Sequence, residues 1–227
     1  MGISGYFLRY PVDRRCRTHP STIVNRVFIP IPLADAEVAV HHGMSLPRPS
    51  PDLLVALQQD IAWKQENIVL FGRTYLQPRL LAWYGDPEAR YRYSRVVHDP
   101  LPWTPLLMDL RHAVESVTGH RFNSVLLNRY RDGADAMGAH SDDEPELGPA
   151  PVIASLSLGA ARPFVFHSRH TPRRPAHRLI LPDGSLLLMA GTTQRWWKHS
   201  LPRTRHPVGE RINLTFRLVR PPALQAT

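Results

Sequence analysis

Two short polar motifs contain residue types that bind metal ions. The first is His140-Ser-Asp142, in which an imidazole and a carboxylate are two residues apart. In an extended segment, residues i and i+2 point to the same face, so these side chains would converge on one point. His199 follows later, at the end of a strand-like run that begins at Arg195. Two histidines and one carboxylate, with coordination positions left open, form the ligand set of non-haem Fe(II) oxygenases.

Other interpretations of these residues are simpler. His140-Ser-Asp142 is also compatible with an ordinary polar loop, because the chain contains 12 histidines and such pairs arise by chance. Zinc is a poorer choice than iron, since hydrolytic zinc sites more often use three histidines or a helical His-Glu-x-x-His motif, which this sequence lacks. The single cysteine, Cys16, cannot supply paired thiolates. Any metal must therefore sit on His, Asp and Glu side chains.

The segment 211–217 alternates strictly between polar and apolar residues, which is typical of a strand with one buried face. The polar face would carry Arg211, Asn213, Thr215 and Arg217, and the apolar face Ile212, Leu214, Phe216 and Leu218. We expect the apolar face to pack and the polar face to bind. The two arginines would suit a short dicarboxylate held between or beside them. The alternative is a solvated strand face with two ordinary arginines.

The elements that would position these motifs fall into two regions. Apolar residues at helical spacing predict a helix from Pro51 to about Ile61 and a second helix over about 105–118 that stops near Gly119. Short runs rich in Val, Leu, Ile and Phe then predict strands near 124–130, 152–158, 163–167, 177–181, 185–189, 195–200 and 211–219. This order predicts an α+β, mainly β fold: an antiparallel sandwich with a helical flank, in one domain.

Composition and charge narrow the class of protein. The 227 residues are 43% hydrophobic and 21% charged, as in ordinary globular proteins. No stretch approaches the roughly 18 to 20 apolar residues of a membrane helix, no secretory signal is visible, and a lone cysteine suits a reducing cytoplasm. The net charge of +9 favours a polyanionic partner, with nucleic acid as the first candidate. We expect residues 1–32 to form a poorly ordered basic extension, with an Arg-rich presequence as a weaker alternative, and residues 221–227 to form a tail.

Together these motifs resemble the AlkB-like Fe(II)/2-oxoglutarate-dependent dioxygenases that repair alkylated nucleic acid, and most closely the bacterial and animal branch that acts on double-stranded DNA. The resemblance extends over about 35–220 and includes the stretches 128–133, 140–144, 152–159, 163–166, 184–189, 199–202 and 211–217. It implies a single dioxygenase domain at 33–220, with flanking N-terminal helices, a nucleotide-recognition region at about 65–100 and a double-stranded β-helix, or jelly-roll, core at about 123–220. It also implies a cytoplasmic, bacterial, nucleoid-associated protein.

The resemblance implies a binding site for each cofactor. Fe(II) would be held by His140, Asp142 and His199. The cosubstrate 2-oxoglutarate would be held by Asn128, Tyr130, Arg211, Asn213, Thr215 and Arg217. In such enzymes O2 takes the remaining metal position, 2-oxoglutarate becomes succinate and CO2, and an oxidised N-methyl group leaves as formaldehyde.

The same resemblance assigns the region before position 100 to the substrate. A duplex hides the methylated atom, so the base must be flipped out of the stack. Phe71, next to Gly72, resembles an intercalating finger; the alternative is a core aromatic that continues the parity of Ile68 and Leu70. Tyr91 and Tyr93 resemble the aromatic residues that hold the flipped base, and both could instead be interfacial tyrosines.

Further polar residues complete the implied substrate site. Ser94 lies near the flipped base, and Glu144 could accept a hydrogen bond from its exocyclic amino group. Arg79 would line the pocket or order Glu144, and either residue could instead be a surface charge. Phosphate contacts are expected from four basic residues: Arg162, Lys198, Arg203 and Arg205.

The sequence therefore predicts an enzyme that oxidatively demethylates N-alkylated bases, such as N1-methyladenine and N3-methylcytosine, in DNA. The expected partner is alkylated duplex DNA, no membrane is involved, and a monomer is the simplest state. Two alternatives stay open: the same chemistry on RNA or single strands, and a non-catalytic jelly-roll that only binds nucleic acid.

Overall fold

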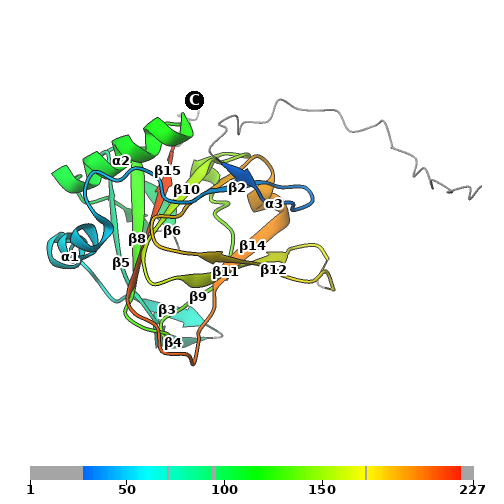
Figure 1. Ribbon diagram of the computed structural model, residues 1–227. Helices are drawn as coiled ribbons and strands as arrows, with labels where there is room; N and C mark the ends of the chain where they lie inside the picture. The colour runs from blue at the N-terminus through cyan, green and yellow to red at the C-terminus, as the bar shows by residue number, and fades with distance from the viewer. Residues whose placement is uncertain (1–27, 71, 94–95, 172, 221–227) are drawn as a thin grey trace, which may run out of the picture.

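The structure, a computed structural model, describes residues 28–70, 72–93, 96–171 and 173–220. Two antiparallel sheets face each other, and α1 (Ser50–Asp60) and α2 (Pro105–Thr118) lie on the outer side of the larger one (Figure 1). The α+β, mainly β fold class predicted from the sequence is confirmed. Within these residues, none of the helices combines the length and the apolar character needed to cross a bilayer.

The larger sheet has seven strands among the described residues, in the order β1-β2-β13-β10-β15-β8-β5. In chain order their bounds are β1 Ile29–Pro30, β2 Glu37–His41, β5 Leu80–Gly85, β8 Ser124–Tyr130, β10 Ile153–Gly159, β13 Leu186–Ala190 and β15 Arg211–Arg217. Strand β15 lies inside the sheet and pairs with β10 on one side and with β8 on the other. Arg211, Asn213 and Thr215 therefore each have a neighbour on two strands, whereas Arg217 is paired with Ser124 of β8 alone.

The smaller sheet has the order β12-β11-β14-β9. Its strands are β9 Met137–His140, β11 Arg162–Ser168, β12 His177–Leu181 and β14 Trp197–Leu201. From β8 onward the chain passes repeatedly between the two sheets, which is the connectivity of a jelly-roll. Two hairpins precede this core, and their strands are β3 Asn67–Leu70, β4 Arg73–Leu76, β6 Tyr91–Tyr93 and β7 Val96–His98. The remaining elements are the 3-10 helix η1 Pro145–Leu147 and the short helix α3 Thr193–Trp196.

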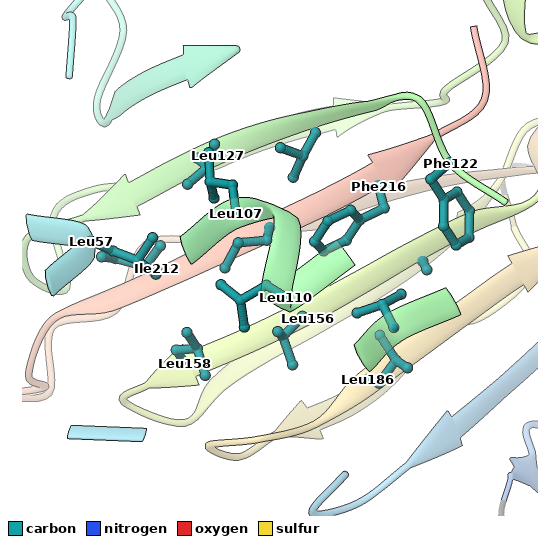
Figure 2. Close-up of a cluster of buried hydrophobic side chains, with 14 of the residues drawn as sticks. Leu57, Leu107, Leu110, Phe122, Leu127, Leu156, Leu158, Leu186, Ile212 and Phe216 are labelled. Atoms are coloured by element: carbon teal, nitrogen blue, oxygen red, sulfur yellow. The ribbon is translucent and has the colours of Figure 1, made fainter. Parts of the chain in front are cut away.

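Two apolar layers hold the molecule together. The first lies between the helices and the outer face of the larger sheet, where Leu107 and Leu110 of α2 meet Ile212 and Phe216 of β15 (Figure 2). All four side chains are fully buried. The second layer lies between the sheets and includes Phe166 of β11. Because outward residues of β15 are used for packing, its inward residues are left for a site between the sheets.

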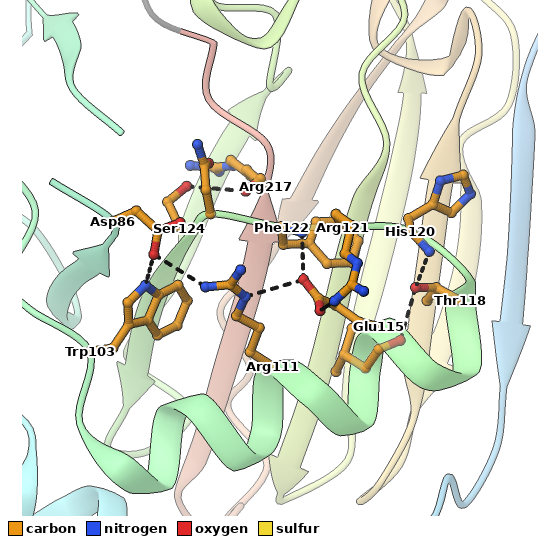
Figure 3. A network of polar contacts seen from close by, with 12 residues as sticks. Asp86, Trp103, Arg111, Glu115, Thr118, His120, Arg121, Phe122, Ser124 and Arg217 are labelled. Carbon is orange, nitrogen blue, oxygen red and sulfur yellow. Dashed lines mark hydrogen bonds and ion pairs between the residues drawn. The ribbon is translucent and has the colours of Figure 1, made fainter. Parts of the chain in front are cut away.

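The second helix ends as its sequence predicts, and a polar network fixes the chain that follows. Gly119 adopts a left-handed conformation with φ of 72° and closes α2. Glu115 then accepts hydrogen bonds from Arg111, Arg121 and the backbone N–H of Phe122 (Figure 3). The turn into β8 is thereby tied to the helix, which sets the position of the strand that carries Asn128 and Tyr130.

Four local expectations were wrong. Residues 28–32 are not a poorly ordered extension, because Phe28 is buried and β1 pairs with β2. The sequence did not reveal this strand, since two residues are too few to show an alternation of polar and apolar side chains. The strand expected at 195–200 begins at Trp197, since the chain first forms α3. The strand β9 ends at His140, so Asp142 lies in an irregular segment. Leu218 lies beyond β15 and is exposed. Residues 1–27 and 221–227 lie outside the described residues.

Candidate active site

His140, Asp142 and His199 come together between the sheets. One ligand atom from each of the three side chains lies within 4.8 Å of the others, and no other such group of His, Cys, Asp or Glu occurs among the described residues. The His140 Nε2 to Asp142 Oδ1 distance is 4.0 Å, and His199 Nε2 to Asp142 Oδ2 is 3.6 Å. The convergence predicted from the sequence is therefore present.

The two histidines are positioned by strand pairing. His140, the last residue of β9, lies directly opposite His199 of β14, and their ring centroids are 4.2 Å apart. The Nδ1 of His140 faces the carbonyl oxygen of Gly138 at 3.0 Å. Since a carbonyl can only accept, Nδ1 carries the proton and leaves the Nε2 lone pair free for a metal. Phe164 stacks on the His199 ring, with centroids 5.2 Å apart and an interplanar angle of 17°.

The electrostatics of the cluster suit a cation. Burial lowers the pKa of His199 to about 3, so its imidazole is neutral. Burial opposes ionisation of Asp142, but Arg217 and the two neighbouring histidines more than offset it and keep the pKa of this carboxyl below its usual value. Arg217 bonds to Asp142 Oδ1, whereas the buried Oδ2 has no hydrogen-bond partner. Two imidazoles and one carboxylate with an unsatisfied oxygen therefore fit a divalent iron ion.

A cleft extends from this cluster across the polar face of β15. The cleft, including its mouth open to solvent, has a volume of about 450 Å³ and is lined by all four polar residues of the strand, Arg211, Asn213, Thr215 and Arg217. The expected division of the strand is confirmed, because Ile212, Leu214 and Phe216 are fully buried on the opposite face. The alternative of a solvated strand face is wrong.

Arg211 is the most unusual group in the cleft. Its side chain is only 1% exposed, its Nη2 donates to Ser157 Oγ at 2.8 Å and Asn213 Oδ1 at 2.9 Å, and its Nε has no partner. Burial lowers its pKa to about 10, so the guanidinium is still charged at neutral pH. No carboxylate of the described residues forms an ion pair with it. A buried cation without a counter-ion is a binding site for an anion.

The other expected cosubstrate residues surround Arg211. Tyr130 lies opposite Arg211 on β8, and its ring is 5.5 Å from the guanidinium carbon. Burial raises the pKa of Tyr130, which keeps the phenol neutral and able to donate a hydrogen bond. Asn128 lies opposite Asn213, and Asn213 in turn donates to Thr215 Oγ1 at 2.9 Å. All of these residues line the cleft.

Arg217 differs from Arg211 because its charge is already paired. Its guanidinium is bound to Asp142, so it is not available as a second free cation at the far end of the strand. A dicarboxylate held between the two arginines would have to displace this pair. The structure instead favours an anion beside Arg211, with Arg217 close to the metal carboxylate.

Four of the expected substrate residues have side chains that lie outside the described part of the structure. Phe71 and Ser94 lie outside the described residues, and the structure describes only the backbone of Tyr91 and Tyr93, which form β6. The adjacent hairpin is described: Leu70 of β3 pairs with Arg73 of β4, and Gly72 has φ of 75°. The finger and base-cradle roles therefore stay predictions.

Arg79 and Glu144 occupy two different places. Arg79 is buried, and its Nε donates to Asn128 Oδ1 at 2.7 Å, so it supports the cosubstrate end of the cleft. It is not an exposed surface charge. Glu144 lines a second cleft of about 280 Å³ together with Trp83 and Arg217. Burial raises the pKa of Glu144, and its Oε2 has no hydrogen-bond partner.

The assignment of Arg162 to phosphate contact was wrong. This side chain is fully buried, and its guanidinium donates to the carbonyl oxygens of Asp132, Asp135 and Pro202. Arg162 therefore holds two loops together, a role that a single sequence does not reveal. The other three predicted phosphate contacts are exposed, and we call them the basic rim: Lys198, Arg203 and Arg205.

Some residues of the site were missed. Ser155 and Ser157 of β10 face the cleft residues of β15, and the alternation Ala-Ser-Leu-Ser-Leu could have indicated a polar inner face. Gln194 and Arg169 contact the segment around Asp142. No local pattern could have identified these two, because their contacts depend on a turn between strands.

Comparisons with known proteins agree with this geometry. Residues 37–217 match the family model described as the 2OG-Fe(II) oxygenase superfamily. The chain is 43% identical over 198 residues to the rat protein "Alpha-ketoglutarate-dependent dioxygenase alkB homolog 3". The aligned region covers 84% of this chain and 66% of the rat protein. It is 44% identical over 159 residues to the human protein "DNA oxidative demethylase ALKBH2", which covers 67% of this chain and 61% of that protein. The solved structure of OsALKBH1 shares the fold, with a TM-score of 0.58 at 16% identity over 80% of this chain and 96% of that one.

Proposed function

Because the chain belongs to the 2OG-Fe(II) oxygenase superfamily, as the match over residues 37–217 shows, we propose that it oxidatively demethylates N-alkylated bases in nucleic acid, with alkylated DNA as its substrate. One observation carries the oxygenase chemistry: the buried, unpaired Arg211 shares a cleft with the His140, Asp142 and His199 cluster. The similarity to the human protein DNA oxidative demethylase ALKBH2 supports the choice of DNA.

The described residues fit both cofactors. His140, Asp142 and His199 would hold Fe(II), and Arg211 would pair with a carboxylate of 2-oxoglutarate, with Asn128 and Tyr130 beside it. When bound, Fe(II), 2-oxoglutarate and O2 together supply an oxidant that hydroxylates the N-methyl group, while 2-oxoglutarate becomes succinate and CO2. The bond between the hydroxymethyl carbon and the base nitrogen would then break: its electron pair returns to the nitrogen, the carbon leaves as formaldehyde, and the hydroxyl proton goes to solvent, so the cationic lesion becomes the neutral base.

The protein's own residues bind and orient the reactants. The Tyr130 phenol is neutral and can donate to a carboxylate, while Arg211 neutralises its charge. Arg217 keeps Asp142 ionised and binds one of its two carboxylate oxygens, which leaves the other without a hydrogen-bond partner. His140 is the most exposed of the three ligands, with 30% of its side chain accessible, so a base would approach the metal from this side.

Substrate recognition would use residues other than those that line the metal cleft. Glu144 has a buried oxygen without a partner, which supports its role as an acceptor for the exocyclic amino group that N1-methyladenine and N3-methylcytosine both carry. The exposed basic rim and the net charge of +9 support phosphate contact. We keep Phe71, Tyr91, Tyr93 and Ser94 as proposed base contacts, and duplex DNA as the preferred form.

The proposal is tested with oligonucleotides that carry one N1-methyladenine or N3-methylcytosine. Wild type and Asp142→Ala are incubated with Fe(II), ascorbate and 2-oxoglutarate, and formaldehyde and succinate are both quantified. Wild type should release both products and Asp142→Ala neither. Succinate without formaldehyde on every methylated substrate would leave the oxygenase assignment intact and refute nucleic-acid demethylation.

The form of the nucleic acid is tested with the same lesions in duplex DNA, single-stranded DNA and RNA. Phe71→Ala should impair repair of the duplex selectively, because only a duplex leaves a gap when a base is flipped. Equal loss on single strands would contradict the wedge role. Preferred turnover of RNA would replace DNA by RNA in the proposal.

A further inference from the structure

The three metal ligands are not held in the same way. His140 and His199 form a directly opposed pair across β9 and β14, so the sheet itself fixes their separation. Asp142 lies two residues beyond the end of β9, in a segment without strand pairing. Its carboxylate is bound by Arg217, but this bond does not fix the path of the backbone. Other contacts must therefore hold the chain around Asp142.

One such contact comes from Gln194 in the short helix α3. The backbone N–H of Asp142 donates to Gln194 Oε1 at 3.0 Å. Gln194 is only 2% exposed, and its amide nitrogen contacts the sulfur of Met189 at 3.6 Å. Since α3 runs directly into β14, this bond ties the carboxylate ligand to the strand that carries the second histidine.

The second contact comes from Arg169, the residue that follows β11. A single nitrogen, Nη1, donates to Asp143 Oδ2 at 2.5 Å, to the Gln194 carbonyl oxygen at 2.8 Å and to Ser141 Oγ at 3.4 Å. The Arg169 backbone N–H also donates to the carbonyl oxygen of Trp196 at 2.9 Å. Arg169 thus contacts the side chains of both residues that flank Asp142 and joins them to the turn that precedes β14.

We infer that Arg169 and Gln194 are positioning residues for the carboxylate ligand of the metal, a role that rests on the proposed iron site. Neither side chain belongs to the ligand cluster, and both act through the segment 141–143. Partners that orient metal ligands typically contribute about 10-fold to 100-fold in metal affinity. Loss of Arg169 removes a side-chain contact on each side of Asp142 and leaves the segment held by Gln194 and by the bond from Ser141 Oγ to the Trp197 carbonyl oxygen, so the third ligand is held less firmly.

The exposure of the Arg169 contacts separates this role from a general stabilising one. The side chains of Arg169 and Asp143 are 29% and 49% exposed, and partly exposed ion pairs contribute little to the free energy of unfolding. Removing the pair should therefore weaken metal binding and leave the melting temperature nearly unchanged. A role in folding alone would produce the opposite pattern.

The geometry also predicts which substitution preserves the function. Because all three side-chain contacts come from one nitrogen, the planar fork of an arginine is not needed, and the three donors of a lysine ammonium can replace them. Arg169→Lys should therefore retain metal affinity, whereas Arg169→Ala should lose it. Arg178→Ala is the matched control, since Arg178 is an exposed arginine on the neighbouring strand β12.

The experiment measures Mn(II) binding to the metal-free full-length protein by electron paramagnetic resonance, together with the melting temperature of each variant. Arg169→Ala should raise the Mn(II) dissociation constant by about 10-fold to 100-fold, with Arg169→Lys and Arg178→Ala within about threefold of wild type. In turnover assays the Fe(II) concentration for half-maximal activity should rise in Arg169→Ala, while the KM for 2-oxoglutarate stays close to wild type.

Wild-type Mn(II) affinity in Arg169→Ala would overturn the inference and leave the proposed function intact. If Arg169→Ala does not fold, Asp143→Ala removes the exposed partner instead, and unchanged Mn(II) affinity in that variant would also overturn the inference. Absence of Mn(II) binding in wild type would refute the iron site itself, and the positioning role with it.

Discussion

Arg211→Met is expected to separate the stability of the protein from its affinity for 2-oxoglutarate. In the free protein Arg211 is a buried cation that no carboxylate of the described residues neutralises. The lowering of its pKa to about 10 corresponds to roughly 3 kcal/mol of lost solvation for the charged form. Methionine removes this penalty while filling much of the same space.

The substitution also removes favourable contacts. Arg211 donates to Ser157 and Asn213, and each of these hydrogen bonds contributes about 1 kcal/mol. Neither acceptor is left without a hydrogen-bonding option, because the Ser157 hydroxyl can rotate and Asn213 Oδ1 still accepts a hydrogen bond from Ser155. The two effects nearly cancel, so the free energy of unfolding without ligand should change by no more than about 1 kcal/mol.

The effect on binding should be much larger. Removing one partner of a buried, hydrogen-bonded charge pair costs about 2 to 5 kcal/mol. At 1.4 kcal/mol for each factor of ten, the KM for 2-oxoglutarate should rise by about 30-fold to a few thousand-fold. The KM is measured from succinate release at saturating Fe(II), and stabilisation of the fold by added 2-oxoglutarate is measured by thermal shift.

A second buried arginine provides the control. Arg162 is equally buried, but its guanidinium donates to three backbone carbonyl oxygens, which methionine would leave without a donor. Arg162→Met should therefore lower the free energy of unfolding by about 3 kcal/mol or more. A KM for 2-oxoglutarate within about threefold of wild type in Arg211→Met would refute the pairing of this residue with the cosubstrate.

Three further predictions concern other parts of the molecule. Asp142→Ala should abolish detectable turnover and weaken Mn(II) binding, as measured by succinate release and spin resonance, because the metal loses its only anionic ligand. Replacing all three residues of the basic rim by alanine should weaken binding to methylated DNA and reduce the slope of log K against log salt by about 2 to 3 units, measured by fluorescence anisotropy; an unchanged slope would exclude these phosphate contacts. Glu115→Gln should destabilise the fold by about 1 to 3 kcal/mol at neutral pH, since Glu115 accepts three hydrogen bonds. Burial opposes its ionisation, but these donors lower its pKa overall, so its contribution is present above the ordinary carboxyl pKa and is lost as pH falls through the folded value. Urea denaturation should therefore show the difference between variant and wild type shrinking from about pH 5 to pH 3, and a constant difference would contradict this origin.

Local sequence patterns predict much of this fold because some signals depend only on neighbouring residues. The strict alternation of residues 211–217 is enough by itself to separate the packing face of β15 from its ligand face. The second helix was predicted over the observed bounds, since Pro105 begins it and Gly119 closes it in a left-handed conformation. In both cases the signal lies within one element, so no knowledge of distant contacts was required.

The wrong or missing assignments depend on contacts between segments that are far apart in the chain. Arg162 was predicted to contact phosphate, and only the packing of two distant loops around it makes it a buried donor to three carbonyl groups. Arg169 and Gln194 carried no local signal for the same reason. A single sequence shows which residues are charged, but it does not show which of these side chains are buried in the folded protein.

The two sheets contribute different parts of the site, and this division suggests how metal and cosubstrate binding depend on each other. The smaller sheet supplies both histidines, whereas the larger sheet supplies Arg211 and its neighbours. Asp142 and Arg217 form the ion pair that crosses between the two halves. A bound ion that shared the Asp142 carboxylate would weaken the pair with Arg217, and the Arg217 guanidinium would then be freer to meet an incoming carboxylate. Binding of the metal should therefore favour binding of 2-oxoglutarate, and by thermodynamic reciprocity the cosubstrate should tighten the metal by the same factor.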